Sequence, residues 1–263
     1  MRIRRIAAPV LTGALALGAV AVPTAAFAAT AKPVITKAVS PSMNLGLSGT
    51  VTAGVTVTAT DASGIKAIYA EPYPVALAEQ IHAVPTAADV LSDASDNLLK
   101  VKSSTATSQT ASVLESRRFS STSGLSDSLA GTWAVAVVVV AKNGATTFNP
   151  QATTYAWTRA DEVGSKVSAT RVRKGAQLTV KGQLNRADWS ARAYRGYGAQ
   201  LVRLEFRRTG GTTWTTVAWA RSGKTGALSS TVKDSTGGSW RYVFGGNASS
   251  GGASSAQTWV GLA

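Results

Sequence analysis

The stretch that decides the fold is Gly131-Thr-Trp-Ala-Val-Ala-Val-Val-Val-Val-Ala-Lys-Asn-Gly-Ala-Thr-Thr-Phe148. Successive side chains of an extended strand point to opposite faces, so Trp133 and Val137 share one face while Ala134 and Val138 share the other. The intervening residues are also apolar on both faces. A strand of this kind has no side for solvent, which predicts the central strand of a packed sheet.

Two further features extend this prediction. Asn143-Gly144 follows the apolar run and predicts a hairpin, because the pair suits the two positive-φ positions of a type I′ turn. A weaker form of the motif returns in the second half as Gly238-Ser-Trp-Arg-Tyr-Val-Phe244. The chain is therefore expected to contain two β domains in series.

The N-terminal segment has the pattern of an export signal. Arg2, Arg4 and Arg5 precede the uncharged apolar run Ile6–Val22, and Ala26-Phe-Ala28 fits the small-residue cleavage rule. This predicts a secretory signal peptide over residues 1–28 rather than a membrane anchor. The paired arginines hint at the twin-arginine route, but the rest of that motif is not met, so the export route stays open.

Several absences bound the product. The chain has no cysteine, so neither a lipid anchor nor a disulfide is expected. No second apolar run of about 20 residues predicts a transmembrane segment, and no sorting motif is found at the C-terminus. We expect a secreted, extracellular protein that is either released or held to the cell wall only by non-covalent contacts.

The charge is distributed unevenly. Residues 29–160 hold nine Lys and Arg against eight Asp and Glu, whereas residues 161–263 hold fifteen against five. With the three arginines of the signal, this accounts for the formal net charge of +14. The change in charge favours a boundary near residues 160–165.

The first domain is predicted over residues 29–160. Short β-patterned segments separated by turns indicate seven strands, with Pro72 and Pro74 ending the one that starts at Ile65. Thr86 and Asp89 predict a capped helix in a short insertion near residues 86–100. Asp61-Ala-Ser-Gly64 has the composition of a turn.

A linker is predicted over residues 161–165 and a second, basic domain over residues 166–263. Apolar alternation is clear in Ala176–Leu184, Val202–Phe206 and Trp240–Phe244, again within a set of seven strands that begins with Val167–Val172. Each of these three segments is expected to place one row of side chains inward. Four tryptophans are expected in the two cores: Trp133, Trp157, Trp219 and Trp240.

Residues 33–159 resemble bacterial immunoglobulin-like domains, through Thr-Ala-Thr-Asp61-Ala-Ser-Gly64-Ile-Lys, Gly131-Thr-Trp-Ala-Val-Ala and the Asn-Gly hairpin. The second half is similar to another immunoglobulin-like module, through Gly175…Leu-Thr-Val-Lys-Gly182, Tyr194-Arg-Gly-Tyr197 and Gly238-Ser-Trp-Arg. Both resemblances lie with uncharacterised exported proteins of high-GC Gram-positive bacteria. They imply an all-β protein, with two immunoglobulin-like β-sandwich domains in tandem after a cleaved signal peptide, and no catalytic residues.

The side-chain inventory argues against an enzyme. His82 is the single histidine, and no nucleophile elbow supplies a partner for it. Without cysteine and with one histidine, a His- or Cys-based metal site is excluded, and no cofactor is expected. Asp89, Asp93, Asp96 and Asn97 form an acidic cluster at helical spacing, which favours a solvated helix face over the loop of a calcium site.

The strongest candidate for binding is the connection between Arg186 and Gly198, together with the strand that follows it. Arginine can hold phosphate or carboxylate in a bidentate manner, and aromatic rings can stack on sugars or bases. The alternative is that the aromatic residues close one end of the sandwich and the arginines are only solvated. The candidate residues are Arg186, Trp189, Arg192, Tyr194, Arg195, Tyr197, Arg203, Arg207 and Arg208.

Three functions are consistent with these features. The favoured one is a non-catalytic binding or structural protein whose basic second domain associates with anionic cell-envelope polymers. The alternative is an extracellular protein–protein interaction or inhibitor module, and the third is a calcium-binding surface protein. No motif predicts sequence-specific binding of nucleic acid.

Overall fold

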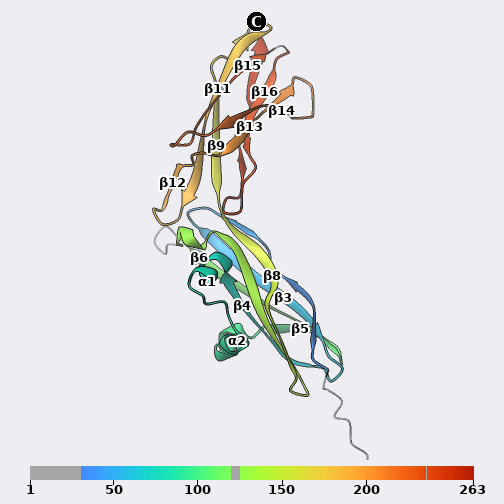
Figure 1. Ribbon diagram of the computed structural model, residues 1–263. Helices are drawn as coiled ribbons and strands as arrows, with labels where there is room; N and C mark the ends of the chain where they lie inside the picture. Colours follow the sequence, from blue (N-terminus) through green and yellow to red (C-terminus); the bar gives the residue numbers. More distant parts are fainter. Residues whose placement is uncertain (1–30, 120–124, 235) are drawn as a thin grey trace, which may run out of the picture. The chain divides into compact units, whose positions relative to one another are not determined.

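A computed structural model describes residues 31–119, 125–234 and 236–263, and Ala31–Ala263 forms one compact unit. The predicted signal peptide lies outside the described residues. The chain is almost entirely β-structure, arranged as two pairs of packed sheets (Figure 1). The all-β prediction is confirmed.

The first sandwich consists of two four-stranded sheets. One has the order β1 (Val34–Val39), β3 (Gly49–Thr60), β6 (Ser108–Phe119), β5 (Lys100–Ser104), and the other has the order β2 (Met43–Leu45), β8 (Thr146–Arg159), β7 (Gly131–Ala141), β4 (Ile65–Pro74).

Strand β7 occupies the position predicted from its sequence. It pairs with β4 on one side and β8 on the other, and every residue from Trp133 to Val139 is buried. The Trp133 and Val137 face packs into the core between the two sheets. The Ala134 and Val138 face is covered by helices that the sequence places between β4 and β5, so neither face meets solvent.

The predicted insertion near residues 86–100 contains two of these helices, and a third helix precedes it at Val75–Gln80. Thr86 and Asp89 make the expected capping box, and Val90 is fully buried against the outer face of β7. The helical pattern is interrupted at Asp93, which occupies the N-cap position of a further short helix without a capping side-chain hydrogen bond. The helical elements among the described residues are α1 (Val75–Gln80), α2 (Ala87–Ser92), α3 (Ala94–Asn97) and the 3₁₀ turn η1 (Asp127–Leu129).

Two local predictions for this half are wrong. Only Gly144 of the Asn143-Gly144 pair has a positive φ, 86°, and its amide donates to the Ala141 carbonyl. The hairpin is therefore a type I turn with a glycine bulge, which has the same handedness of twist as the predicted turn. Strand β4 also continues through Pro72 to Pro74, because it is an edge strand whose outer side needs no amide donors.

The second sandwich contains the predicted alternating strands. Leu178, Leu184, Leu204 and Tyr242 are fully buried at its centre. One sheet contains β9 (Asp161–Val167), β11 (Ala176–Asp188), β12 (Ala193–Gly196) and β15 (Ala227–Asp234). The other has the order β10 (Arg171–Val172), β18 (Thr258–Leu262), β16 (Gly238–Phe244), β13 (Leu201–Arg208), β14 (Thr215–Arg221), with β17 (Ala253–Ser254) also on β16.

Strand boundaries differ from the sequence prediction where pairing decides them. The segment Val167–Val172 is not one strand, because β9 ends at Val167 and β10 starts at Arg171 in the opposite sheet. The described residues contain eight strands in the first sandwich and ten in the second, rather than seven in each. Residues 161–165 lie in β9 and pair with β11, so this connection is itself part of a sheet.

Candidate binding surface

The predicted binding residues separate into two groups. Arg186, Trp189, Arg192, Tyr194, Arg195 and Tyr197 lie on β11, β12 and the connections beside them, whereas Arg203, Arg207 and Arg208 lie on β13 in the other sheet. The structure therefore does not bring the whole set into one patch. Each group has its own partners, and these decide what it can bind.

Trp189 belongs to the interior. Its side chain is 3% exposed and packs with Leu45 and Ala187. The indole nitrogen donates to the carbonyl of Leu45 at 3.2 Å and to that of Gly46 at 3.0 Å. Residues from the first half of the chain thus satisfy Trp189 completely, which corrects its prediction as a ligand-binding residue.

The arginines beside Trp189 already have partners. Arg186 places its guanidinium 3.8 Å from the centre of the Tyr197 ring, and Arg195 lies 3.4 Å from Asp188. They line a cavity of about 250 Å³ together with Arg159, whose guanidinium is 2.7 Å from Asp127. Sequence reasoning could not indicate the Asp127 partner, because that residue comes from a distant part of the chain. The presence of Asp127 and Asp188 reduces the attraction of this cavity for an anion.

The remaining members of this group are more open. Arg192 is exposed and has a positive φ of 58°, in the turn between β11 and β12. Tyr194 is half-buried, and its hydroxyl lies close to Gly46. The Tyr197 hydroxyl accepts from the Asn247 amide at 2.7 Å. The two tyrosines thus contact neighbouring loops. This agrees with the alternative in which aromatic residues close one end of the sandwich.

Asp161 lies next to this cavity and is buried. Removal from water raises the pKa of its carboxyl group from 3.8 to about 6, although the Gly252 amide and the nearby Arg186 and Arg159 oppose the rise. One carboxylate oxygen accepts from Gly252 at 3.2 Å, and the other has no partner among the described residues. The ionised form of this group is therefore disfavoured in the folded chain.

This burial predicts a pH dependence of stability. Because the folded pKa is raised, the contribution of Asp161 is fully present below about pH 4 and is lost as pH rises through about 6. Asp161→Asn removes the charge and keeps an acceptor for Gly252. The difference in melting temperature is that of the variant minus that of the original chain. We expect this difference to be several degrees higher at pH 8 than at pH 4. Thermal melts at both pH values measure this, and an equal difference at the two would contradict it.

The second group lies on the outward face of the sheet formed by β10, β18, β16, β13 and β14. Arg203 forms a 3.3 Å ion pair with Glu205, and Arg207 donates to the Gln257 side chain at 2.7 Å. Arg208 is exposed at the end of β13. Glu205 also pairs with Arg241, at 2.8 Å. One carboxylate thus pairs with two guanidinium groups, and Arg207 has no acidic partner in these contacts, so the face stays positive.

This face also contains aromatic residues that sequence reasoning missed or misplaced. Trp219, expected in the core, is 61% exposed. It lies on the edge strand β14, where the small side chains of Ala218 and Ala220 point inward instead. Trp259 is 52% exposed on β18. The alternation in these strands was visible in the sequence, but which row faces the core was not.

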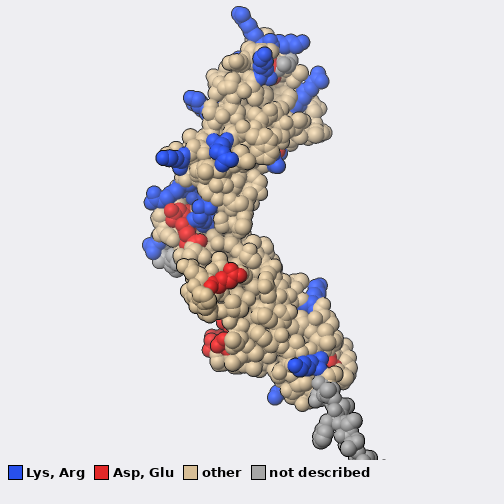
Figure 2. Space-filling model, viewed as in Figure 1, with Lys and Arg blue, Asp and Glu red and all other residues tan. Residues whose placement is uncertain are grey.

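We name this surface the Trp–Arg face. It consists of Arg171, Arg203, Glu205, Arg207, Trp214, Trp219, Arg241 and Trp259. Figure 2 shows that Lys and Arg predominate over the strands of the second sandwich on the side in view, whereas Asp and Glu gather elsewhere. The excess of basic residues in the second half of the sequence thus appears as positive charge on the surface of the second sandwich.

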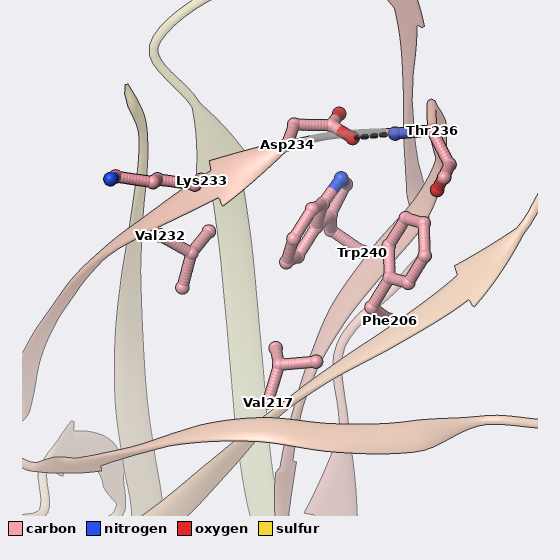
Figure 3. A pocket seen from close by; sticks show the side chains of 7 residues that line it. All are labelled: Phe206, Val217, Val232, Lys233, Asp234, Thr236 and Trp240. Atoms are coloured by element: carbon pink, nitrogen blue, oxygen red, sulfur yellow. Dashed lines mark hydrogen bonds between the residues drawn. The ribbon is translucent and has the colours of Figure 1, made fainter. Parts of the chain in front are cut away.

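A pocket of about 400 Å³ opens between the edges of β14 and β15 (Figure 3). Trp240 directs its indole nitrogen toward the carboxylate of Asp234, which accepts from the amides of Thr236 and Gly237. That nitrogen and the second carboxylate oxygen have no hydrogen-bond partner among the described residues. A donor and an acceptor placed in this way suit one bridging water. We therefore assign the polar groups of this pocket a structural role in the turn after β15.

The sequence also raised His82 and the acidic cluster that begins at Asp89. His82 is exposed in the turn after α1. Asp89 accepts from the amide and hydroxyl of Thr86, which lowers the pKa of its carboxyl group. Within the described ranges, no group of three or more His, Cys, Asp or Glu side chains is arranged to hold a metal ion. In the same ranges, no helix is long and apolar enough to cross a membrane.

Comparison with known proteins does not assign the chain to a family. No protein-family model and no curated protein matches it. The resemblance to exported immunoglobulin-like proteins of high-GC bacteria stays a prediction.

Solved structures do match over most of the chain. The fibronectin(III)-like modules of Clostridium thermocellum CbhA are 13% identical, with 88% of this chain and 94% of that chain covered and a TM-score of 0.36. The D00-D0 domain of Intimin is 12% identical over 87% and 98%, with a TM-score of 0.28. The adhesin InvE of Yersinia pseudotuberculosis is 12% identical over 85% and 58%, also with a TM-score of 0.28. Likeness this distant carries no argument about function, so function is argued from the surface alone.

Proposed function

We propose that the chain is a secreted, non-catalytic binding or structural protein whose basic second half associates with anionic polymers of the cell envelope. The observation that carries this proposal is the charge imbalance. Residues 161–263 hold fifteen Lys and Arg against five Asp and Glu. Many of these basic side chains are exposed, among them Arg171, Arg192 and Arg208.

The geometry supports attraction to a polymer more than a closed small-molecule site. The basic side chains are spread over two sheets and their connections. In the cavity of about 250 Å³, Arg159 and Arg195 are already paired with Asp127 and Asp188. A long anion can contact several separated positive groups at once, which raises its overall affinity without any deep pocket. The predicted signal peptide would direct the chain out of the cell, where such a polymer is found.

Salt dependence tests the proposal. The full chain is incubated with isolated cell envelope at about 50 mM and about 500 mM salt, which shortens the screening length from about 14 Å to about 4 Å. We expect retention in the first condition and release in the second. Retention that survives the higher salt would instead indicate a protein partner with an apolar interface. Absence of retention in both would refute envelope binding.

A pair of charge variants separates surface charge from total charge. In the test variant, four exposed or half-exposed arginines of the second half are replaced by glutamine, and in the control four exposed lysines of the first half are replaced in the same way. Both variants lose four positive charges, so equal losses of retention would show that location is irrelevant. We expect the test variant to release at lower salt than the control. The test positions are Arg192, Arg195, Arg207 and Arg208, and the control positions are Lys37, Lys66, Lys100 and Lys102.

A further inference from the structure

Trp259 forms a flat, exposed platform on the Trp–Arg face. A side-chain carbon at Gly261 would lie 2.5 Å from Cη2 and 3.0 Å from Cζ3 of Trp259, so the indole ring rests on the backbone of its own strand at this glycine. Gly261 is buried although its strand is at the surface, while Trp259 is 52% exposed. The indole nitrogen donates to the Thr209 hydroxyl at 3.4 Å. One ring face is thus supported, and the other is open to solvent.

Positive groups flank this platform on both sides. Arg171 on β10 is the register partner of Gly261, over which the ring lies. On the other side, Ser239 of β16 is the register partner of both Trp259 and Arg207. Because neighbouring strands lie about 4.8 Å apart, Arg171 and Arg207 stand on either side of the ring within a few strand spacings.

A second exposed ring lies across the same sheet. Trp219 on β14 is the register partner of Arg203 on β13. Three strand spacings separate β14 from β18, so the two exposed rings belong to strands about 14 Å apart. Between them, the guanidinium groups of Arg241 and Arg207 lie 4.1 Å and 4.8 Å from the ring centre of Trp214. These stacked contacts hold the arginines extended along the sheet.

The charge of the face selects an anion. Of the acidic residues in residues 166–263, only Glu205 lies on this face, and its carboxylate is already bonded to Arg203 and Arg241. The rings favour a ligand with flat apolar surfaces, because such a surface removes the exposed face of an indole from water. A ligand that satisfies both must alternate flat rings with negative groups and be long enough to span two platforms.

We propose that the Trp–Arg face binds an acidic polysaccharide. The carbon–hydrogen faces of its sugar rings pack on Trp259 and Trp219, and its carboxylates pair with the intervening arginines. This assignment rests on the proposed association with envelope polymers and adds to it the chemical class of the ligand. A polymer of phosphates without rings would meet the arginines but leave both platforms uncovered.

Two variants test the platform without touching its charges. Trp259→Ala removes the ring, and Gly261→Leu keeps the ring but displaces it from its support. Phe148→Ala, at an exposed aromatic on β8, is the matched control. Circular dichroism and thermal melts confirm that each variant folds. The probes are polygalacturonate, which has rings and charge, polyphosphate, which has charge alone, dextran, which has rings alone, and oligo(dT).

We expect Trp259→Ala and Gly261→Leu to weaken binding of polygalacturonate about tenfold, the loss typical of one stacked ring. Binding of polyphosphate should stay within about twofold, and Phe148→Ala should change neither. The inference is overturned if both variants leave polygalacturonate binding unchanged, if they weaken polyphosphate equally, or if oligo(dT) binds more tightly than polygalacturonate. Failure of all polyanions to bind at low salt would refute the proposed function itself, which keeps the two failures distinct.

Discussion

Val137→Asp is expected to prevent the first sandwich from folding. Val137 is fully buried at the centre of β7 and packs in the core between the two sheets. An aspartate there would have no hydrogen-bond partner and no water, and the cost of burying an unpaired charge is comparable with or greater than the about 5–15 kcal/mol by which domains are stable. Circular dichroism and thermal melting of the purified variant measure the loss.

The matched control is Val101→Asp. Val101 is 55% exposed on the edge strand β5, so the same chemical change should cost no more than about 0.5 kcal/mol. If the two variants melted at similar temperatures, β7 would not be the centre of the core. A Val137→Asp chain that kept the full β-sheet circular dichroism of the original chain would lead to the same conclusion.

Trp189→Ala is expected to cost about 3–5 kcal/mol of stability, the range for truncation of a buried tryptophan. The substitution removes a side chain that is 3% exposed and two hydrogen bonds to the carbonyls of Leu45 and Gly46. It takes one donor from the Gly46 carbonyl, whereas the Leu45 carbonyl still accepts from the amide of Ala160 at 2.8 Å. Chemical denaturation, followed by tryptophan fluorescence and circular dichroism, measures the change in free energy of unfolding.

Trp219→Ala serves as the comparison, because Trp219 is 61% exposed and its loss should cost no more than about 0.5 kcal/mol. Comparing the two variants also separates the two roles considered for aromatic residues, which are ligand binding and packing at one end of the sandwich. A stable Trp189→Ala chain with weakened polymer binding would restore Trp189 as a ligand-binding residue. A destabilised chain that still binds when folded would support its structural role.

Much of the fold could be predicted because it depends on local patterns. The apolar faces of β7, the alternation of Ala176–Leu184 and the capping box of Thr86 and Asp89 each lie within a short segment. Strand and helix geometry convert such patterns directly into buried rows and caps. The turn at Asn143-Gly144 was also placed correctly, although its type was not, because the glycine position is local while the bulge depends on the register of both strands.

The candidate surface was less predictable, because partners distant in the chain decide it. Nothing near Trp189 in the sequence indicates that Leu45 and Gly46 will accept from its indole, or that Asp127 will pair with Arg159 beside Arg186. The alternation of Val202–Phe206 places Arg203 and Arg207 opposite its apolar row, but the rings beside them come from β14, from β18 and from Trp214 just before β14. The close contact of Trp259 with Gly261 was readable only as Trp-x-Gly, a spacing that many strands contain.

By itself, therefore, the sequence determined an all-β chain, the central position of Gly131–Ala141 in its sheet and the concentration of positive charge in the second half. Side-chain alternation and composition are properties of the chain that survive any arrangement of strands. The tertiary structure alone decided which arginines are neutralised and which tryptophans are exposed. Both depend on the neighbour that sheet pairing and sheet packing bring to each side chain, and those neighbours lie far away in the sequence.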